Sequence, residues 1–199
     1  MTRTQWIILL VSGISSGAAV MGCAPGGVGD PCIPEDEYTA YFPGFGATEA
    51  NVESRSFQCE TRVCIVNHFQ GRVSCPYGQS SDDSGQLIPS AAGQCYVPSS
   101  STPVTIAVQP QLLERRADST VYCSCRCEGA DKTAKYCSCP SGYSCSQLVP
   151  DIGIGKVNLA GKYCLKNGTE FTTLKGGTCD AQTKSCDTPG NPAGKNPAP

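Results

Sequence analysis

The chain has 199 residues, with 15 basic and 17 acidic side chains and a formal net charge of −2. This balance excludes the basic field that nucleic-acid-binding proteins carry, so we expect no nucleic acid partner. The 15 cysteines and the single histidine indicate a disulfide-stabilised chain from an oxidising compartment.

The N-terminal segment is typical of an exported lipoprotein. Arg3 is followed by the apolar stretch WIILLVSGISSGAAVM (6–21). A membrane-spanning helix needs about 20 mainly apolar residues, so this shorter stretch favours a secretory signal. It ends in VMGC (20–23), which resembles the bacterial lipobox, where a small residue precedes the cysteine that receives the lipid. We predict a signal peptide over 1–22 and lipidation of Cys23; the alternative is a signal peptide cut near residues 18–19, which leaves Cys23 for a disulfide.

If Cys23 is lipidated, the N-terminus of the mature protein is anchored in a membrane, so we predict a membrane as its partner. Two or three acyl chains, at about 0.8 kcal/mol per buried CH₂, hold a protein there far better than one chain does. Residue 24 is alanine and not aspartate, which in the best-known sorting rule for lipoproteins favours the outer membrane, on its periplasmic or surface face. Residues 23–30 are expected to form a lipidated, glycine-rich tether.

The other fourteen cysteines form an even set that can pair completely. Five precede and nine follow a composition break at VPSSSTP (97–103), so complete pairing needs at least one disulfide across that break. We predict seven disulfides in a single domain over 31–187, with 31–97 and 104–187 as sub-lobes, and a disordered tail over 188–199. The predicted disulfide cysteines are Cys32, Cys59, Cys64, Cys75, Cys95, Cys123, Cys125, Cys127, Cys137, Cys139, Cys145, Cys164, Cys179 and Cys186.

The elements expected along this domain are mainly short strands. TRVCIVNHF (61–69) alternates apolar residues and turns into RVSC (72–75), which predicts a hairpin. VTIAVQ (104–109) and KVNLAGKYCLKNG (156–168) predict further strands, whereas PQLLERRA (110–117) allows two helical turns at most. The fold class is therefore mainly β: a small disulfide-rich fold of short strands and hairpins with little helix.

A second hairpin is expected from STVYCSCRC (119–127) and AKYCSC (134–139). Residues i, i+2 and i+4 of a strand share one face, so five cysteines would lie together: Cys123, Cys125, Cys127, Cys137 and Cys139. Such a set suits either a thiolate centre for zinc or iron–sulfur or a group of disulfides to separate partners.

Disulfides are favoured over a metal because thiols are oxidised in the expected compartment and the chain has no CxxC pair. We predict no metal and no cofactor. Cys123 and Cys125 should not pair with each other, since their Cα atoms in an extended strand would lie about 6.6–6.8 Å apart, at the limit of disulfide geometry.

Few residues suit catalysis. The only histidine, His68, lies in an expected strand beside Phe69, where a structural role is favoured over a general base. The mature chain contains no G-x-S-x-G elbow, H-E-x-x-H motif or P-loop. The acidic clusters at 35–37 and 82–83 lack the spacing of a calcium loop. We expect a protein that is not an enzyme and has no catalytic residue.

Several stretches together carry a resemblance to a family. They are ESRSFQCETRVC (53–64), CSCRC (123–127), CSCPSGYSC (137–145) and the VMGC lipobox, and they look like the cysteine-rich lipoproteins common in myxobacteria. The resemblance implies lipidation and a disulfide framework and brings no activity. We expect a structural, adhesive or protein-interaction role at the cell envelope, with a protein partner there. The alternatives are an envelope hydrolase that uses carboxylates and a thiolate metal-binding lipoprotein.

Overall fold

The computed structural model describes residues 26–149, 160–172 and 176–186. Cys23, the predicted signal peptide and the predicted tail lie outside these residues. The elements in chain order are the 3₁₀-helix η1 (Glu35–Tyr38), β1 (Ala50–Glu53), β2 (Val63–Asn67), β3 (Gln79–Ser81), β4 (Leu87–Pro89), α1 (Ala117–Thr120), β5 (Val121–Ser124), β6 (Arg126–Glu128), β7 (Tyr143–Val149) and β8 (Gly161–Lys166). The fold is mainly β with little helix, as predicted. Within the described part of the chain, no helix is long and apolar enough to cross a membrane.

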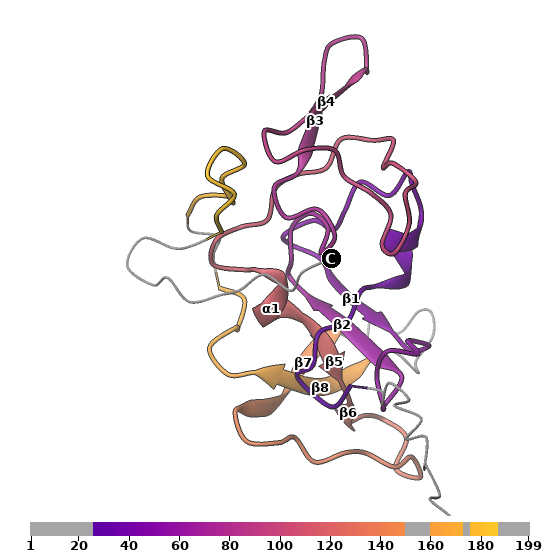
Figure 1. Ribbon diagram of the computed structural model, residues 1–199. Helices are drawn as coiled ribbons and strands as arrows, with labels where there is room; N and C mark the ends of the chain where they lie inside the picture. Colours follow the sequence, from indigo (N-terminus) through magenta and orange to yellow (C-terminus); the bar gives the residue numbers. More distant parts are fainter. Residues whose placement is uncertain (1–25, 150–159, 173–175, 187–199) are drawn as a thin grey trace, which may run out of the picture.

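The strands form three small antiparallel sheets, with the orders β1–β2–β5, β3–β4 and β6–β8–β7. In Figure 1 the β3–β4 hairpin stands at the top, and the β6–β8–β7 sheet lies low in the view. The central sheet is buried on both faces. Cys64 and Val66 of β2 pack into one apolar cluster, whereas Ile65 packs into a second cluster with Tyr163 and Leu165 of β8.

The predicted strand within 61–69 is β2, and the one within 156–168 is β8. The predicted strands at 72–75 and 104–109 are wrong, because each takes part only in isolated β-bridges. The predicted helix at 110–117 is reduced to α1, which starts at its last residue.

The predicted hairpin between 119–127 and 134–139 is also wrong. Segment 134–139 contains no strand, and β6 pairs with β8 instead. The reason is burial: β8 places Tyr163 and Leu165 in the core, whereas the residues of 134–139 are exposed or half-exposed. The chain leaves the central sheet at Ser124 and enters the lower sheet at Arg126, so the expected cysteines do not share one strand face.

The fourteen predicted cysteines form seven disulfides: Cys32–Cys64, Cys59–Cys123, Cys75–Cys95, Cys125–Cys137, Cys127–Cys145, Cys139–Cys164 and Cys179–Cys186. The Cys59–Cys123 bond crosses the break at 97–103, which confirms the disulfide that the five-plus-nine division required. As predicted, Cys123 and Cys125 have separate partners.

Candidate functional site

Residues 39–49 contain no strand and residues 68–116 contain only the short β3 and β4, so much of this backbone must find hydrogen-bond partners among side chains. Arg72 is the main donor. Its side chain is fully buried, and its guanidinium donates to the carbonyls of Thr39 at 3.2 Å and Phe42 at 2.9 Å, and also to that of Glu37. One side chain thereby fixes the turn that follows η1.

Glu37 is the only buried acidic side chain among the described residues, and it faces Arg72 at 3.9 Å. Its carboxylate accepts hydrogen bonds from the amides of Val73 and Ser74 and from the Ser74 hydroxyl at 2.7 Å. Burial raises the pKa of Glu37, against these hydrogen bonds and Arg72, which favour the charged form. The carboxylate orders residues 72–74, which is a structural role.

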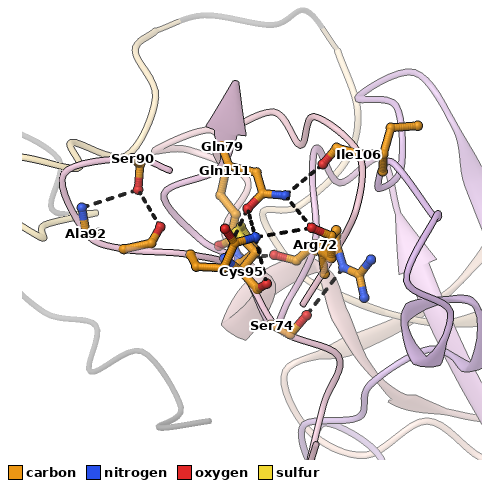
Figure 2. The surroundings of a disulfide bond; sticks show 12 residues. Arg72, Ser74, Gln79, Ser90, Ala92, Cys95, Ile106 and Gln111 are labelled. Atoms are coloured by element: carbon orange, nitrogen blue, oxygen red, sulfur yellow. Dashed lines mark hydrogen bonds between the residues drawn. A yellow bond between two sulfur atoms is a disulfide. The ribbon is translucent and has the colours of Figure 1, made fainter. Parts of the chain in front are cut away.

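A layer of buried amides continues from this pair toward the Cys75–Cys95 disulfide (Figure 2). Gln79 donates to the carbonyls of Val104 at 3.0 Å and Ile106 at 2.8 Å, and it accepts from the amide of Cys95 at 3.0 Å. Gln111 donates to the carbonyl of Arg72 at 2.9 Å. These side chains hold the segment 94–106 in place without regular sheet structure.

A cleft of about 540 Å³ lies beside this layer, and we call it the disulfide cleft. It is lined by the Cys75–Cys95 disulfide and, among others, by the apolar residues Pro31, Ile33, Val73, Pro76 and Pro98. None of its lining residues carries a formal charge. A charged ligand would therefore lose hydration there without gaining an ionic partner, so the cleft favours neutral, partly apolar groups.

A second cleft, of about 690 Å³, adjoins the first and shares Tyr77, Gly78 and Ser90 with it. Glu49 is the one charged residue in its lining. The Tyr77 hydroxyl donates to the carbonyl of Lys184 at 2.7 Å, so the shared wall is connected to the Cys179–Cys186 loop. The two adjoining clefts together form a mainly uncharged surface.

The walls of the disulfide cleft are rigid for two reasons. The Cys75–Cys95 disulfide joins two lining segments, Cys32–Cys64 fixes a third to β2, and proline has a fixed φ. A surface that is already ordered loses little conformational entropy when a ligand binds. The cleft is therefore suited to binding.

His68 is not in a strand, contrary to the sequence-based expectation; it follows β2 with a φ of 53°. Its ring stacks on Phe171, with the ring centroids 4.0 Å apart. Burial, and secondarily the charge of Arg115, lowers the pKa of His68. His68 does not line either cleft, and its contacts fit the structural role predicted for it.

Four of the five cysteines considered as metal ligands lie in two groups around Cys164. The sulfur atoms of Cys125, Cys137 and Cys164 lie within 4.8 Å of one another, as do those of Cys127, Cys139 and Cys164. Each of these cysteines is in a disulfide, and a disulfide sulfur is not the thiolate that binds zinc. This cluster therefore cross-links β6, β7 and β8.

Sequence reasoning did not identify the residues that form the disulfide cleft. Its three cysteines were predicted only as members of disulfides, and its apolar lining residues come from separate segments between 31 and 117. Pro31, Pro76 and Pro98 all line the cleft, but nothing in their spacing distinguishes them from prolines in ordinary turns.

Comparisons of this chain with protein-family models, curated proteins and solved structures find no match.

Proposed function

We propose that this protein is an exported, lipid-anchored protein of the bacterial cell envelope that binds another envelope protein through the disulfide cleft and is not an enzyme. The observation that carries the proposal is the chemistry of the cleft: rigid, mainly apolar walls and no charged lining residue. The buried ionisable pair beside it, Glu37 and Arg72, is used by the fold.

The partner that fits is an uncharged, extended segment of a protein. The two clefts share Tyr77, Gly78 and Ser90, so an extended chain that follows this shared wall contacts both. Tyr77 lines both clefts, and tyrosine is enriched at protein interfaces. An extended chain would bring both apolar side chains and peptide groups to such a surface.

The lipid anchor and the export are supported by the sequence. The VMGC stretch places Cys23 at the end of the apolar segment, and removing Cys23 from the count leaves the fourteen cysteines that pair. Seven disulfides are what a chain in an oxidising compartment forms. Mass spectrometry of the mature protein tests the anchor, because acylation of Cys23 adds the mass of its lipid.

The binding role is tested by photo-crosslinking in cells. A photoreactive residue is placed at Ala92, which lines the disulfide cleft, and as a control at Ile88, which is 49% exposed on β4 and lines neither cleft. We expect one defined protein adduct from position 92 and none from position 88. An Ala92→Arg substitution should remove binding of the identified partner, whereas Ile88→Arg should not. Equal adducts from both positions, or binding unaffected by Ala92→Arg, would contradict the proposal.

A further inference from the structure

The described chain is bound to the body of the protein from its first residue. The Gly26 amide donates to the carbonyl of Gln58 at 2.7 Å, and the Gly26 carbonyl accepts from the amide of Glu60 at 2.9 Å. Gly29 donates to the carbonyl of Cys123 at 2.8 Å. Part of the expected tether over 23–30 is therefore attached to the loop that joins β1 to β2.

This loop, residues 54–62, carries the most exposed large hydrophobic side chain of the described residues, Phe57, which is 79% exposed. The guanidinium of Arg62 lies 4.2 Å from the centroid of the Phe57 ring. Arg55 and Arg62 are both exposed and outnumber the one acidic residue of the loop, Glu60. An exposed ring with one arginine against it and a second in the same loop is a combination suited to the surface of a phospholipid bilayer, where the ring enters the acyl boundary and arginine binds phosphate.

The distance from the predicted anchor restricts where the body can lie. Cys23 precedes Gly26 by three residue steps, which span at most about 11 Å. The headgroup layer on each side of the hydrocarbon core is about 5–8 Å thick. A lipid on Cys23 would therefore hold Gly26, and the loop bonded to it, at the membrane surface.

The direction of the chain points to the same face. Gly26 and Cys59 form a parallel β-bridge, so the N-terminal side of Gly26 and the N-terminal side of Cys59 face the same way. Phe57 lies on that side of Cys59. The chain thus enters the body on the side of the exposed ring.

We propose that the loop 54–62 is a membrane-contact surface, with Phe57 inserted at the headgroup–acyl boundary and Arg55 and Arg62 on lipid phosphates. This proposal rests on the lipidation of Cys23 in the proposed function. It fixes which face of the protein lies on the bilayer. The control position is on the β3–β4 hairpin, which stands at the top of Figure 1, away from β1 and β2, the strands that the loop 54–62 joins.

The experiment uses the lipidated full chain with a Phe57→Trp substitution. The only tryptophan, Trp6, lies in the predicted signal peptide, so the processed variant has a single tryptophan, which is excited selectively above the absorption of tyrosine. It is reconstituted into vesicles of phosphatidylethanolamine and phosphatidylglycerol, with and without brominated acyl chains. We expect the emission of the Phe57→Trp variant to be blue-shifted relative to the protein in detergent. In vesicles with brominated acyl chains, most of its emission intensity should be quenched. A matched Ile88→Trp variant, on β4, should keep its emission.

Each outcome decides a separate statement. Mass spectrometry that finds no acyl group on the purified protein overturns the anchor, and the contact surface with it. An acyl group, together with emission of the Phe57→Trp variant that brominated lipid leaves unchanged, overturns the contact surface alone. Quenching of both variants overturns it as well, because no face is then preferred. A shift that requires added envelope proteins assigns the loop to a protein partner and contradicts membrane contact.

A measurement without a substitution guards against a variant that folds poorly. Amide hydrogen exchange of the unmodified lipidated protein should slow in residues 54–62 when vesicles replace detergent, and should stay unchanged in residues 79–89. Equal exchange in both media for residues 54–62 would also overturn the contact surface.

Discussion

Two regions of the molecule are stabilised in different ways. The first, residues 70–115, contains only the short β3–β4 sheet and one internal disulfide, Cys75–Cys95, and it buries Arg72, Gln79, Gln111 and Arg115. The second, residues 121–166, contains β5 to β8 and three internal disulfides. We call them the polar region and the disulfide region.

The difference shows two ways for a chain with a small core to remain folded. In the polar region, long side chains provide the hydrogen bonds that neighbouring strands would otherwise provide, and a buried group left unpaired costs about 1–3 kcal/mol. In the disulfide region, β6, β7 and β8 pair with one another and β5 pairs with β2, while the cross-links reduce the conformational freedom of the unfolded chain. The two regions should therefore respond differently to substitution.

Arg72→Ala should have the largest effect. It leaves Glu37 buried without its cation and removes the donor to three carbonyls, so we expect the free energy of unfolding to fall by about 3–5 kcal/mol. Denaturant unfolding measures this change. The control is Lys162→Ala, which removes an exposed ion pair with Glu128 and should cost less than about 1 kcal/mol. Equal losses in the two variants would show that the polar region does not depend on this pair.

Removal of a disulfide should come next. Replacing Cys139 and Cys164 by alanine opens a link with a sequence separation of 25, and the chain-entropy relation gives a loss of about 3–4 kcal/mol. The same change at Cys179 and Cys186, with a separation of 7, should cost about 2 kcal/mol. Unfolding midpoints of both double variants, measured without reductant, test the order. The reverse order would mean that packing around the sulfur atoms, and not the length of the closed loop, sets the contribution.

The strands that the sequence predicted correctly, β2 and β8, both lie outside the polar region, and the reason is physical. Apolar alternation identified β2 because Cys64 and Val66 pack into one buried cluster and Ile65 into another. The strand expected at 104–109 is not formed, because the Gln79 side chain binds the carbonyls of Val104 and Ile106. When a side chain from a distant segment provides the hydrogen bonds that a neighbouring strand would provide, the sequence shows no alternation of apolar residues that could reveal it.

The candidate cleft was also beyond what the sequence could predict. Cys75–Cys95 joins two of its lining segments and Cys32–Cys64 fixes a third to β2, and the connectivity of fourteen cysteines cannot be deduced from their spacing. Parity alone predicted that a disulfide crosses residues 97–103, and Cys59–Cys123 does so. Counting therefore gave the number of links and one constraint on them, but not the surface that they form.

Tyr122 tests whether the disulfide region also depends on a polar side chain. Its hydroxyl accepts a hydrogen bond from the amide of Lys166 at 2.8 Å, and burial raises the pKa of Tyr122 to about 12. Because the folded-state pKa lies above the unfolded value of about 10, the neutral phenol stabilises the fold below pH 10, and this stability is lost as pH rises toward 12.

We expect the wild type to lose about 2–3 kcal/mol of stability between pH 10 and pH 12 that Tyr122→Phe does not lose. Unfolding curves of the two proteins at each pH give the difference, and a free-thiol assay confirms that the disulfides remain intact. Parallel pH dependence in the two proteins would exclude Tyr122 as the group responsible.

His68 should give the smallest effect, and it lies where the polar region meets β2. Arg115 donates to the carbonyl of His68 at 2.6 Å, while the His68 ring stacks on Phe171. Because the backbone contacts do not need the imidazole, His68→Gln should cost about 1 kcal/mol or less, the contribution of one ring pair.

The pH dependence of stability separates the ring from the backbone at this position. The pKa of His68 is lowered by burial, so its neutral form stabilises the fold above pH 6.5, and this stability decreases as pH falls through 6.5 and below. His68→Gln should remove that acid dependence. His68→Asn removes it too but tolerates the positive φ of 53° better, so it should be the more stable of the two variants. Unfolding curves at pH 7 and pH 5 measure both effects, and a loss of partner binding by a folded His68→Asn protein would show that the histidine has a functional role.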